Sequence, residues 1–158
     1  MAWWIAEGSD EPEPEFSLMR DAIHEGGHTL TYAGFGFRPT FVRVDPDKGG
    51  GEMCPEPSSP WRLPTTKQRL LVAQAGSAAE CIWDGDDDLG WTTSGIKDQI
   101  ELQDLLAELG SDLDPNDFTE IDALLRQPDT WSRIVRLAEA LVEQHYIDNL
   151  DPYLVADI

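Results

Sequence analysis

Two of the three histidines in this 158-residue chain lie four residues apart, in the segment His24-Glu25-Gly26-Gly27-His28. Residues four apart on a helix project from one face, one turn above each other, so both imidazoles can reach one metal ion. Glu25 lies about 100° around the helix, where its carboxylate can reach a water on that ion. This spacing is typical of hydrolytic zinc sites. The segment therefore predicts a Zn²⁺ site with His24 and His28 as ligands and Glu25 as general base.

Gly26 and Gly27 separate the glutamate from the second histidine. Each glycine inside a helix costs about 1 kcal/mol relative to alanine. A helix usually accepts such a residue where another part of the chain must approach its backbone closely. We therefore expect tight packing at both positions.

The third zinc ligand is less well defined by the residues alone. A catalytic zinc ion needs three protein ligands and one open position for water. Glu80 is one candidate, because Glu80 and Asp84 have the spacing of a helix-borne glutamate with a second acid. Asp98, at the start of a predicted helix, is another. His145 is a weaker third candidate, because it continues the apolar stripe of the last helix.

A mainly helical fold with a small β-sheet is expected to position these residues. Apolar periodicity and helix-ending residues predict helices over residues 16–33, 65–83, 96–109, 117–125 and 130–145. The fourth of these is predicted to open with a capping box between Asp117 and Glu120. The β-branched run 40–45 predicts a strand, and the glycine-rich loop 48–64 includes a short second strand near residues 51–53.

The chain shows no internal repeat and no linker that divides it. We expect residues 1–15 to form an apolar strap with an acidic tether, and residues 16–158 to form one domain. No apolar run approaches the roughly 18 residues of a membrane span. The opening segment is too short and uncharged for a signal peptide, so a cytoplasmic location is expected.

The formal net charge is −20, from 31 acidic and 11 basic residues. A surface this negative repels phosphate groups, so neither nucleic acid nor an anionic membrane is an expected partner. Cys54 and Cys81 stand in no metal-binding spacing and are expected to be structural thiols.

Three segments of the chain resemble the peptidase domain of the FtsH family of AAA+ zinc metalloproteases. They are residues 23–30 around HEGGH, residues 75–80 (AGSAAE) and residues 93–98 (TSGIKD). They follow the order and approximate spacing of the family's HEAGH helix, AGRAAEE helix and TGASND-like turn. The resemblance covers roughly residues 18 to 155. It implies a zincin-like peptidase domain in which the HExxH helix lies beside an edge strand.

The resemblance also implies roles for individual residues. His24 and His28 would bind zinc, Glu25 would be the catalytic base, and Asp98 would be the third ligand. Glu80 would then be an acid near the site, and its spacing to the next acid a coincidence. Substrate would add as an extra strand beside the edge residues Val42, Arg43, Val44 and Asp45.

The sequence departs from the family in lacking a P-loop GxxxxGK[ST] and a membrane segment. The cluster Gly49-Gly50-Gly51 is not followed by the Lys-Ser/Thr that would bind phosphate. We therefore expect no ATP binding by this chain and a stand-alone zinc endopeptidase acting on peptides or unfolded segments. The alternative is a catalytically silent zincin-fold module that binds or regulates a separate partner protein. Because the family's peptidase domains form rings, oligomers are compatible with either function.

Overall fold

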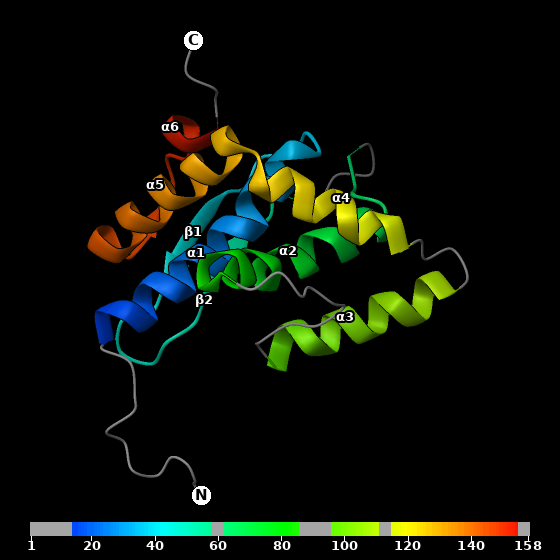
Figure 1. The fold of residues 1–158 in the computed structure, drawn as a ribbon, viewed down its shortest axis with the longest axis horizontal. Coiled ribbons are helices and arrows are strands. Elements are labelled where there is room, and N and C mark those ends of the chain that lie inside the picture. Colours follow the sequence, from blue (N-terminus) through cyan, green and yellow to red (C-terminus); the bar gives the residue numbers. More distant parts are fainter. Residues whose placement is uncertain (1–13, 58–61, 86–95, 111–114, 155–158) are drawn as a thin grey trace, which may run out of the picture.

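The computed structural model describes residues 14–57, 62–85, 96–110 and 115–154 (Figure 1). In chain order the elements are α1 (Pro14–Gly34), β1 (Phe41–Val44), β2 (Gly51–Cys54), α2 (Thr66–Asp84), α3 (Ile96–Leu109), α4 (Pro115–Arg126), α5 (Pro128–Gln144), β3 (Tyr146–Ile147) and α6 (Asp151–Leu154). The expected mainly helical class with a small β-sheet is confirmed. Residues 1–13 of the predicted tether lie outside the described residues.

The helix α1 lies in the middle of the fold, with α2 and α5 packed against it (Figure 1). Its residues 22–32 are all buried. A Cβ atom at Gly27 would lie 2.5 Å from the carbonyl oxygen of Ala75 on α2. A Cβ atom at Gly26 would lie 3.0 Å from Cγ2 of Ile134 on α5. The tight packing predicted at both glycines is confirmed: Gly27 allows the close approach of α2, and Gly26 allows that of α5.

The helix α2 begins with a capping box. The Thr65 side chain accepts a hydrogen bond from the Gln68 N–H at 3.1 Å, and the Gln68 side chain accepts one from the Thr65 N–H at 3.0 Å. The helix ends at Gly85, whose φ of 77° is left-handed. Its buried face carries mostly small residues, among them Ala75 and Ala79, so its backbone can lie close to α1.

The sheet has the strand order β2-β1-β3, with antiparallel pairing on both sides of β1. The prediction that residues 42–45 belong to an edge strand is therefore wrong. Val42 of β1 pairs with Met53 of β2 on one side and with Ile147 of β3 on the other. The edge strands of the described sheet are β2 and β3.

A tight turn explains why β2 covers β1. The Asp45 side chain accepts hydrogen bonds from the N–H groups of Asp47 and Lys48 at 2.9 and 3.0 Å. Gly49 and Gly50 then take left-handed φ values of 81° and 78°, which glycine adopts without steric cost. The chain therefore reverses at once, and β2 runs back along β1.

Two hydrophobic clusters hold the helices together. The main cluster joins side chains from α1, β1, α2, α4 and α5. The second, which we call the α3 cluster, consists of Leu70, Ala73, Leu102 and Leu105. It fixes α3 to α2, the element that α3 mainly contacts, and α3 lies to one side of the fold (Figure 1).

Two helix starts differ from the predictions. The helix α4 begins at Pro115, so Asp117 lies inside it and the predicted capping box is wrong. The helix α5 begins at Pro128, two residues earlier than predicted. In both cases proline occupies the first helical position, where its fixed φ is favourable and its missing N–H is not needed.

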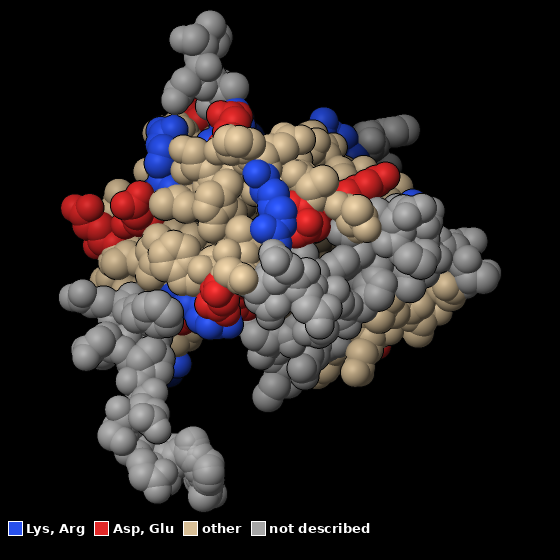
Figure 2. Space-filling model, in the orientation of Figure 1, with Lys and Arg blue, Asp and Glu red and all other residues tan. Residues whose placement is uncertain are grey.

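The surface charge is mixed on the face drawn in Figure 2. Acidic and basic side chains of the described residues lie interleaved there among uncharged ones. Within the described part of the chain, no helix is both long and apolar enough to cross a membrane.

Candidate metal centre

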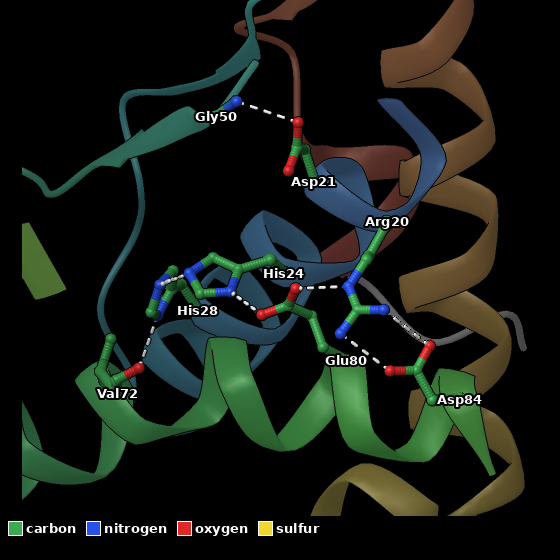
Figure 3. A network of polar contacts seen from close by, with 8 residues as sticks. All are labelled: Arg20, Asp21, His24, His28, Gly50, Val72, Glu80 and Asp84. Atoms are coloured by element: carbon green, nitrogen blue, oxygen red, sulfur yellow. Dashed lines mark hydrogen bonds and ion pairs between the residues drawn. The ribbon is translucent and has the colours of Figure 1, made fainter. Parts of the chain in front are cut away.

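The imidazoles of His24 and His28 come from successive turns of α1 and converge on each other (Figure 3). Their Nε2 atoms are 3.0 Å apart, and their ring planes are nearly perpendicular, at 84°. Two nitrogens bound to one tetrahedral Zn²⁺ at about 2.1 Å each would lie about 3.4 Å apart. The two predicted ligands are therefore close to the separation that a shared ion requires.

The other ring nitrogen of each histidine has an acceptor. Nδ1 of His28 lies 2.6 Å from the carbonyl oxygen of Val72, which can only accept, so this Nδ1 carries the proton. Nδ1 of His24 lies 2.8 Å from Oε2 of Glu80, and an ionised carboxylate likewise only accepts. In a neutral imidazole protonated at Nδ1, Nε2 presents a lone pair. With both Nδ1 atoms protonated, both Nε2 atoms are acceptors, and both can be ligands of one cation.

Glu80 lies behind His24 and not among the atoms that would face the ion. Its contact is to Nδ1, on the opposite side of the ring from Nε2. Metal-bound histidines commonly donate their second N–H to a carboxylate or a carbonyl in this way. Of the two roles left open for Glu80, the structure favours the outer partner over the third ligand.

Arg20 extends this contact into a network (Figure 3). Its Nε donates to Oε1 of Glu80 at 2.9 Å, and its Nη2 pairs with Oδ2 of Asp84 at 2.8 Å. The four-residue spacing between Glu80 and Asp84 is therefore no coincidence, since both carboxylates bind one guanidinium. Sequence reasoning missed Arg20, which lies one turn before His24 on α1.

The charge of Arg20 compensates the buried Glu80 carboxylate. Burial opposes the charge of the guanidinium, but the hydrogen bonds and charges of Glu80 and Asp84 outweigh it and raise the pKa of Arg20. Glu80 is only 6 % exposed. A buried carboxylate requires a charged or hydrogen-bonding partner, and Arg20 and His24 provide both.

Gly76 of α2 faces the two Nε2 atoms. A Cβ atom at this position would lie 2.6 Å from Nε2 of His24 and 2.6 Å from Nε2 of His28. Any side chain here would fill the space in front of both nitrogens. Glycine at this position therefore lets both imidazoles lie directly against the backbone of α2.

Glu25 completes a close group with the histidines. One ligand atom from each of His24, Glu25 and His28 lies within 4.8 Å of the others, and all three residues are buried. This group could hold a metal ion. Among the described residues, no other histidine, cysteine or acidic residue forms such a group.

The strand β2 passes directly over Glu25. A Cβ atom at Gly51 would lie 3.0 Å from Cγ of Glu25. The N–H of Gly50 donates to Oδ2 of Asp21 at 2.9 Å, which ties the turn before β2 to the preceding turn of α1 (Figure 3). Asp21 therefore helps to hold β2 beside the candidate metal centre.

A cavity of about 210 Å³ adjoins this group. Its walls include Glu25 and His28 of α1, residues 51–53 of β2, Arg69 of α2 and Glu101 of α3. The cavity therefore connects the candidate metal centre with an edge strand and with the first half of α3.

The structure does not bring all the predicted residues to the site. Asp98 lies in the first turn of α3, and its side chain is outside the described residues. His145 ends α5 with a φ of 67°, and its carbonyl accepts a hydrogen bond from the Val44 N–H at 2.9 Å, so it is no part of the metal group.

The four residues predicted to bind substrate lie elsewhere. Val42 and Val44 are buried in the main core, Arg43 pairs with Glu52, and Asp45 caps its own turn. None of the four lines the cavity as the structure describes it. Because β1 pairs with a strand on each side, the structure gives these residues no free strand edge, and their role in substrate binding stays a prediction.

Glu101 lines the cavity and was not singled out from the sequence. A signal existed, because positions 98 and 101 are three residues apart and share a helical face.

Neither the protein-family models nor the curated proteins compared with this sequence give a match. The geometry alone describes the site: a buried pair of imidazoles and a neighbouring carboxylate on one helix, a group that could hold a metal ion.

Proposed function

We propose that this protein is a zinc-dependent peptidase with a zincin-like fold, in which His24 and His28 bind zinc and Glu25 is the general base. The observation that carries the proposal is the 3.0 Å approach of the two Nε2 atoms while each Nδ1 is held by an acceptor. Imidazole nitrogens are common ligands of zinc, and two histidines with one carboxylate are a common set of protein ligands in catalytic zinc sites. The resemblance of three segments to the FtsH peptidase domain supports the same class.

The chemistry assigns one task to each group. A Zn²⁺ ion held here supplies Lewis-acid activation of a water molecule and of the peptide carbonyl. Glu25 accepts a proton from the attacking water at its carboxylate and then delivers it to the nitrogen of the leaving amine. Glu80 and Val72 orient the two imidazoles through Nδ1, and Arg20 keeps Glu80 in place.

We propose Asp98 as the third ligand. The supporting observation is that Glu101, one turn further along α3, lines the same cavity as Glu25 and His28. The helical face shared by positions 98 and 101 is therefore the face near the metal centre. Glu101 is the alternative ligand if α3 binds in a different register.

We propose β2, in place of β1, as the strand that binds substrate. The Asp45 N–H donates to the Gly50 carbonyl at 2.9 Å. In an antiparallel ladder the bonding direction alternates, so the backbone groups of Gly51 and Met53 point away from β1. Both residues line the cavity. An extended peptide can add along this edge through backbone hydrogen bonds, so peptides and unfolded segments are the proposed substrates.

The direct test compares hydrolysis of a reduced, unfolded protein by the wild type and by Glu25→Gln, each loaded with zinc. We expect Glu25→Gln to bind one zinc per chain and to lose hydrolysis by about 100- to 10,000-fold. The matched control is Glu139→Gln, an exposed glutamate on α5, which should leave the rate unchanged. Equal turnover by Glu25→Gln would remove Glu25 as the base. Zinc binding without any hydrolysis by the wild type would favour the alternative, a binding module.

A further inference from the structure

One basic side chain of the cavity has no place in the proposed mechanism. Arg69 lines the cavity together with Glu25, His28 and Glu101. It lies on the same stripe of α2 as Val72, which binds His28, and Gly76, which faces both imidazoles, because the three positions are separated by three and four residues. Its side chain is therefore directed along the face of α2 that borders the metal centre.

Arg69 also differs from the other arginines in its contacts. Its side chain makes no hydrogen bond or ion pair with the described residues, and it remains exposed in the cavity wall. All the others donate to an oxygen of the protein: Arg20, Arg38, Arg43, Arg62, Arg126, Arg133 and Arg136. With 31 acidic residues in the chain, acceptors are plentiful. Judged by contacts within the described part of the chain, Arg69 is thus the arginine left available to a ligand.

We propose that the cavity is a specificity pocket for a carboxylate of the substrate, with Arg69 as its anion-binding residue. A guanidinium binds a carboxylate through two parallel hydrogen bonds, a geometry that a backbone carbonyl or an amide does not reproduce. The inference rests on the proposed function only in placing this pocket beside a scissile peptide bond.

The geometry limits where the carboxylate lies in the substrate. Arg69 and Gly76 are seven residues apart on α2, which is about 10 Å along the helix axis. An extended peptide spans that distance in about three residues. The carboxylate is therefore expected within three residues of the scissile bond, either as an Asp or Glu side chain or as the C-terminal carboxylate of a short peptide.

The other charges of the cavity make this preference depend on one residue. Glu25 and Glu101 both contribute negative charge to the wall, and Glu52 is already paired with Arg43. Without Arg69 the cavity would repel a carboxylate. Reversal of the charge in Arg69→Glu should therefore invert the preference toward substrates that carry lysine or arginine.

The test measures binding, so that it does not depend on hydrolysis. Fluorescence anisotropy follows three labelled peptides added to the zinc-loaded Glu25→Gln protein: an amidated peptide with an internal Glu, its amidated Gln counterpart, and the Gln peptide with a free C-terminus. We expect one or both carboxylate peptides to bind about 10- to 100-fold more tightly than the neutral one. The stronger of the two identifies the source of the carboxylate. Introducing Arg69→Gln should abolish the difference. Arg126→Gln changes an arginine of α4 that does not line the cavity, and it should preserve the difference.

The outcomes separate this inference from the proposed function. Equal binding of the three peptides, or a preference that survives Arg69→Gln, would overturn the carboxylate pocket even if the wild type hydrolyses peptides. A preference that depends on Arg69, in a protein whose wild type hydrolyses nothing, would sustain the pocket and refute the peptidase. Urea unfolding of Arg69→Gln and Arg69→Glu checks that both variants fold like the wild type.

Discussion

The two sides of the candidate metal centre are held by the fold in different ways. His24 and His28 lie on α1 in the buried middle of the protein, where Gly27 contacts the backbone of α2 directly. The helix α3, which carries the proposed third ligand, is fixed to α2 through the small α3 cluster, and it lies outside the main core. The histidine side is part of the main core, whereas the α3 side is an attachment to it.

This difference predicts how metal binding and folding are coupled. A helix held by few buried contacts opens at a lower free energy than the core does. An ion that joins α3 to α1 would stabilise the attached side far more than the core side. We therefore expect the histidine pair to be formed in the metal-free protein, and α3 to gain most of its order from the ion.

The largest effect on metal binding is expected from Gly76→Ala. The added Cβ would lie 2.6 Å from both Nε2 atoms, so the imidazoles would have to turn away. We expect the affinity for zinc to fall by about 100-fold. Titration calorimetry with zinc measures it. Gly34→Ala is the control, since its Cβ meets only Leu124 Cδ2 at 3.9 Å. An unchanged affinity in Gly76→Ala would show that no ion binds in front of these nitrogens.

A smaller effect is expected from Glu80→Gln on the histidine side. The amide keeps the size of the side chain but removes the charge that accepts from His24 and pairs with Arg20. Loss of such an outer partner typically lowers metal affinity by about 10- to 100-fold. Competition with a chelator measures this change. X-ray absorption measures the coordination number of the bound zinc, which we expect to be the same in the wild type and in Glu80→Gln. A lower coordination number in the variant would show that Glu80 is a direct ligand.

The attached side is tested by Leu105→Ala. Leu105 is 1 % exposed in the α3 cluster, so its truncation leaves a cavity between α3 and α2. Zinc binds fully only to those molecules in which α3 is packed against α2, so a smaller fraction of such molecules lowers the apparent affinity. We therefore expect the affinity for zinc to fall by about tenfold. Hydrogen exchange should speed up in α3 and stay slow in α1. Leu137→Ala, in the main core, is the contrast and should destabilise both. Equal acceleration in both helices of Leu105→Ala would contradict the division into two sides.

The smallest effect concerns Asp45, whose turn brings β2 over the histidine side. Hydrogen bonds from the N–H groups of Lys48 and Asp47 lower the pKa of Asp45. The ionised Asp45 side chain therefore stabilises the fold at pH values above its pKa in the unfolded state, about 3.9. This stabilisation is lost as the pH falls through the lower pKa of the folded state. Asp45→Asn should unfold at a slightly lower urea concentration than the wild type at pH 7, and the difference should shrink at pH 3. If the two proteins differed by the same urea concentration at pH 7 and at pH 3, the charge of Asp45 would have no stabilising role in the turn.

The histidine side could be predicted from the sequence because local spacing determines it. A separation of four positions between two histidines on a helix fixes their common face, and the glycine pair predicts close packing. Glu80 was recognised as an acid near the site. Its contact with Arg20 was not, because the two residues are 60 positions apart and nothing in the local sequence joins them.

The order of the strands could not be predicted from the sequence. A short alternating run such as residues 41–44 looks the same whether it lies at the edge or in the centre of a sheet. Its position depends on pairing with β2 and with the distant β3. The sequence pattern of a capping box was also ambiguous. Asp117 and Glu120 have the right spacing but lie inside α4, whereas Thr65 and Gln68 form a complete capping box at the start of α2.

The most direct test of the metal centre is an anomalous difference map collected at the zinc edge from crystals grown with one equivalent of zinc. We expect a single strong peak about 2.1 Å from Nε2 of both His24 and His28, with a carboxylate of α3 as the third ligand. No peak between these imidazoles, or side chains that diverge too far to share an ion, would contradict it.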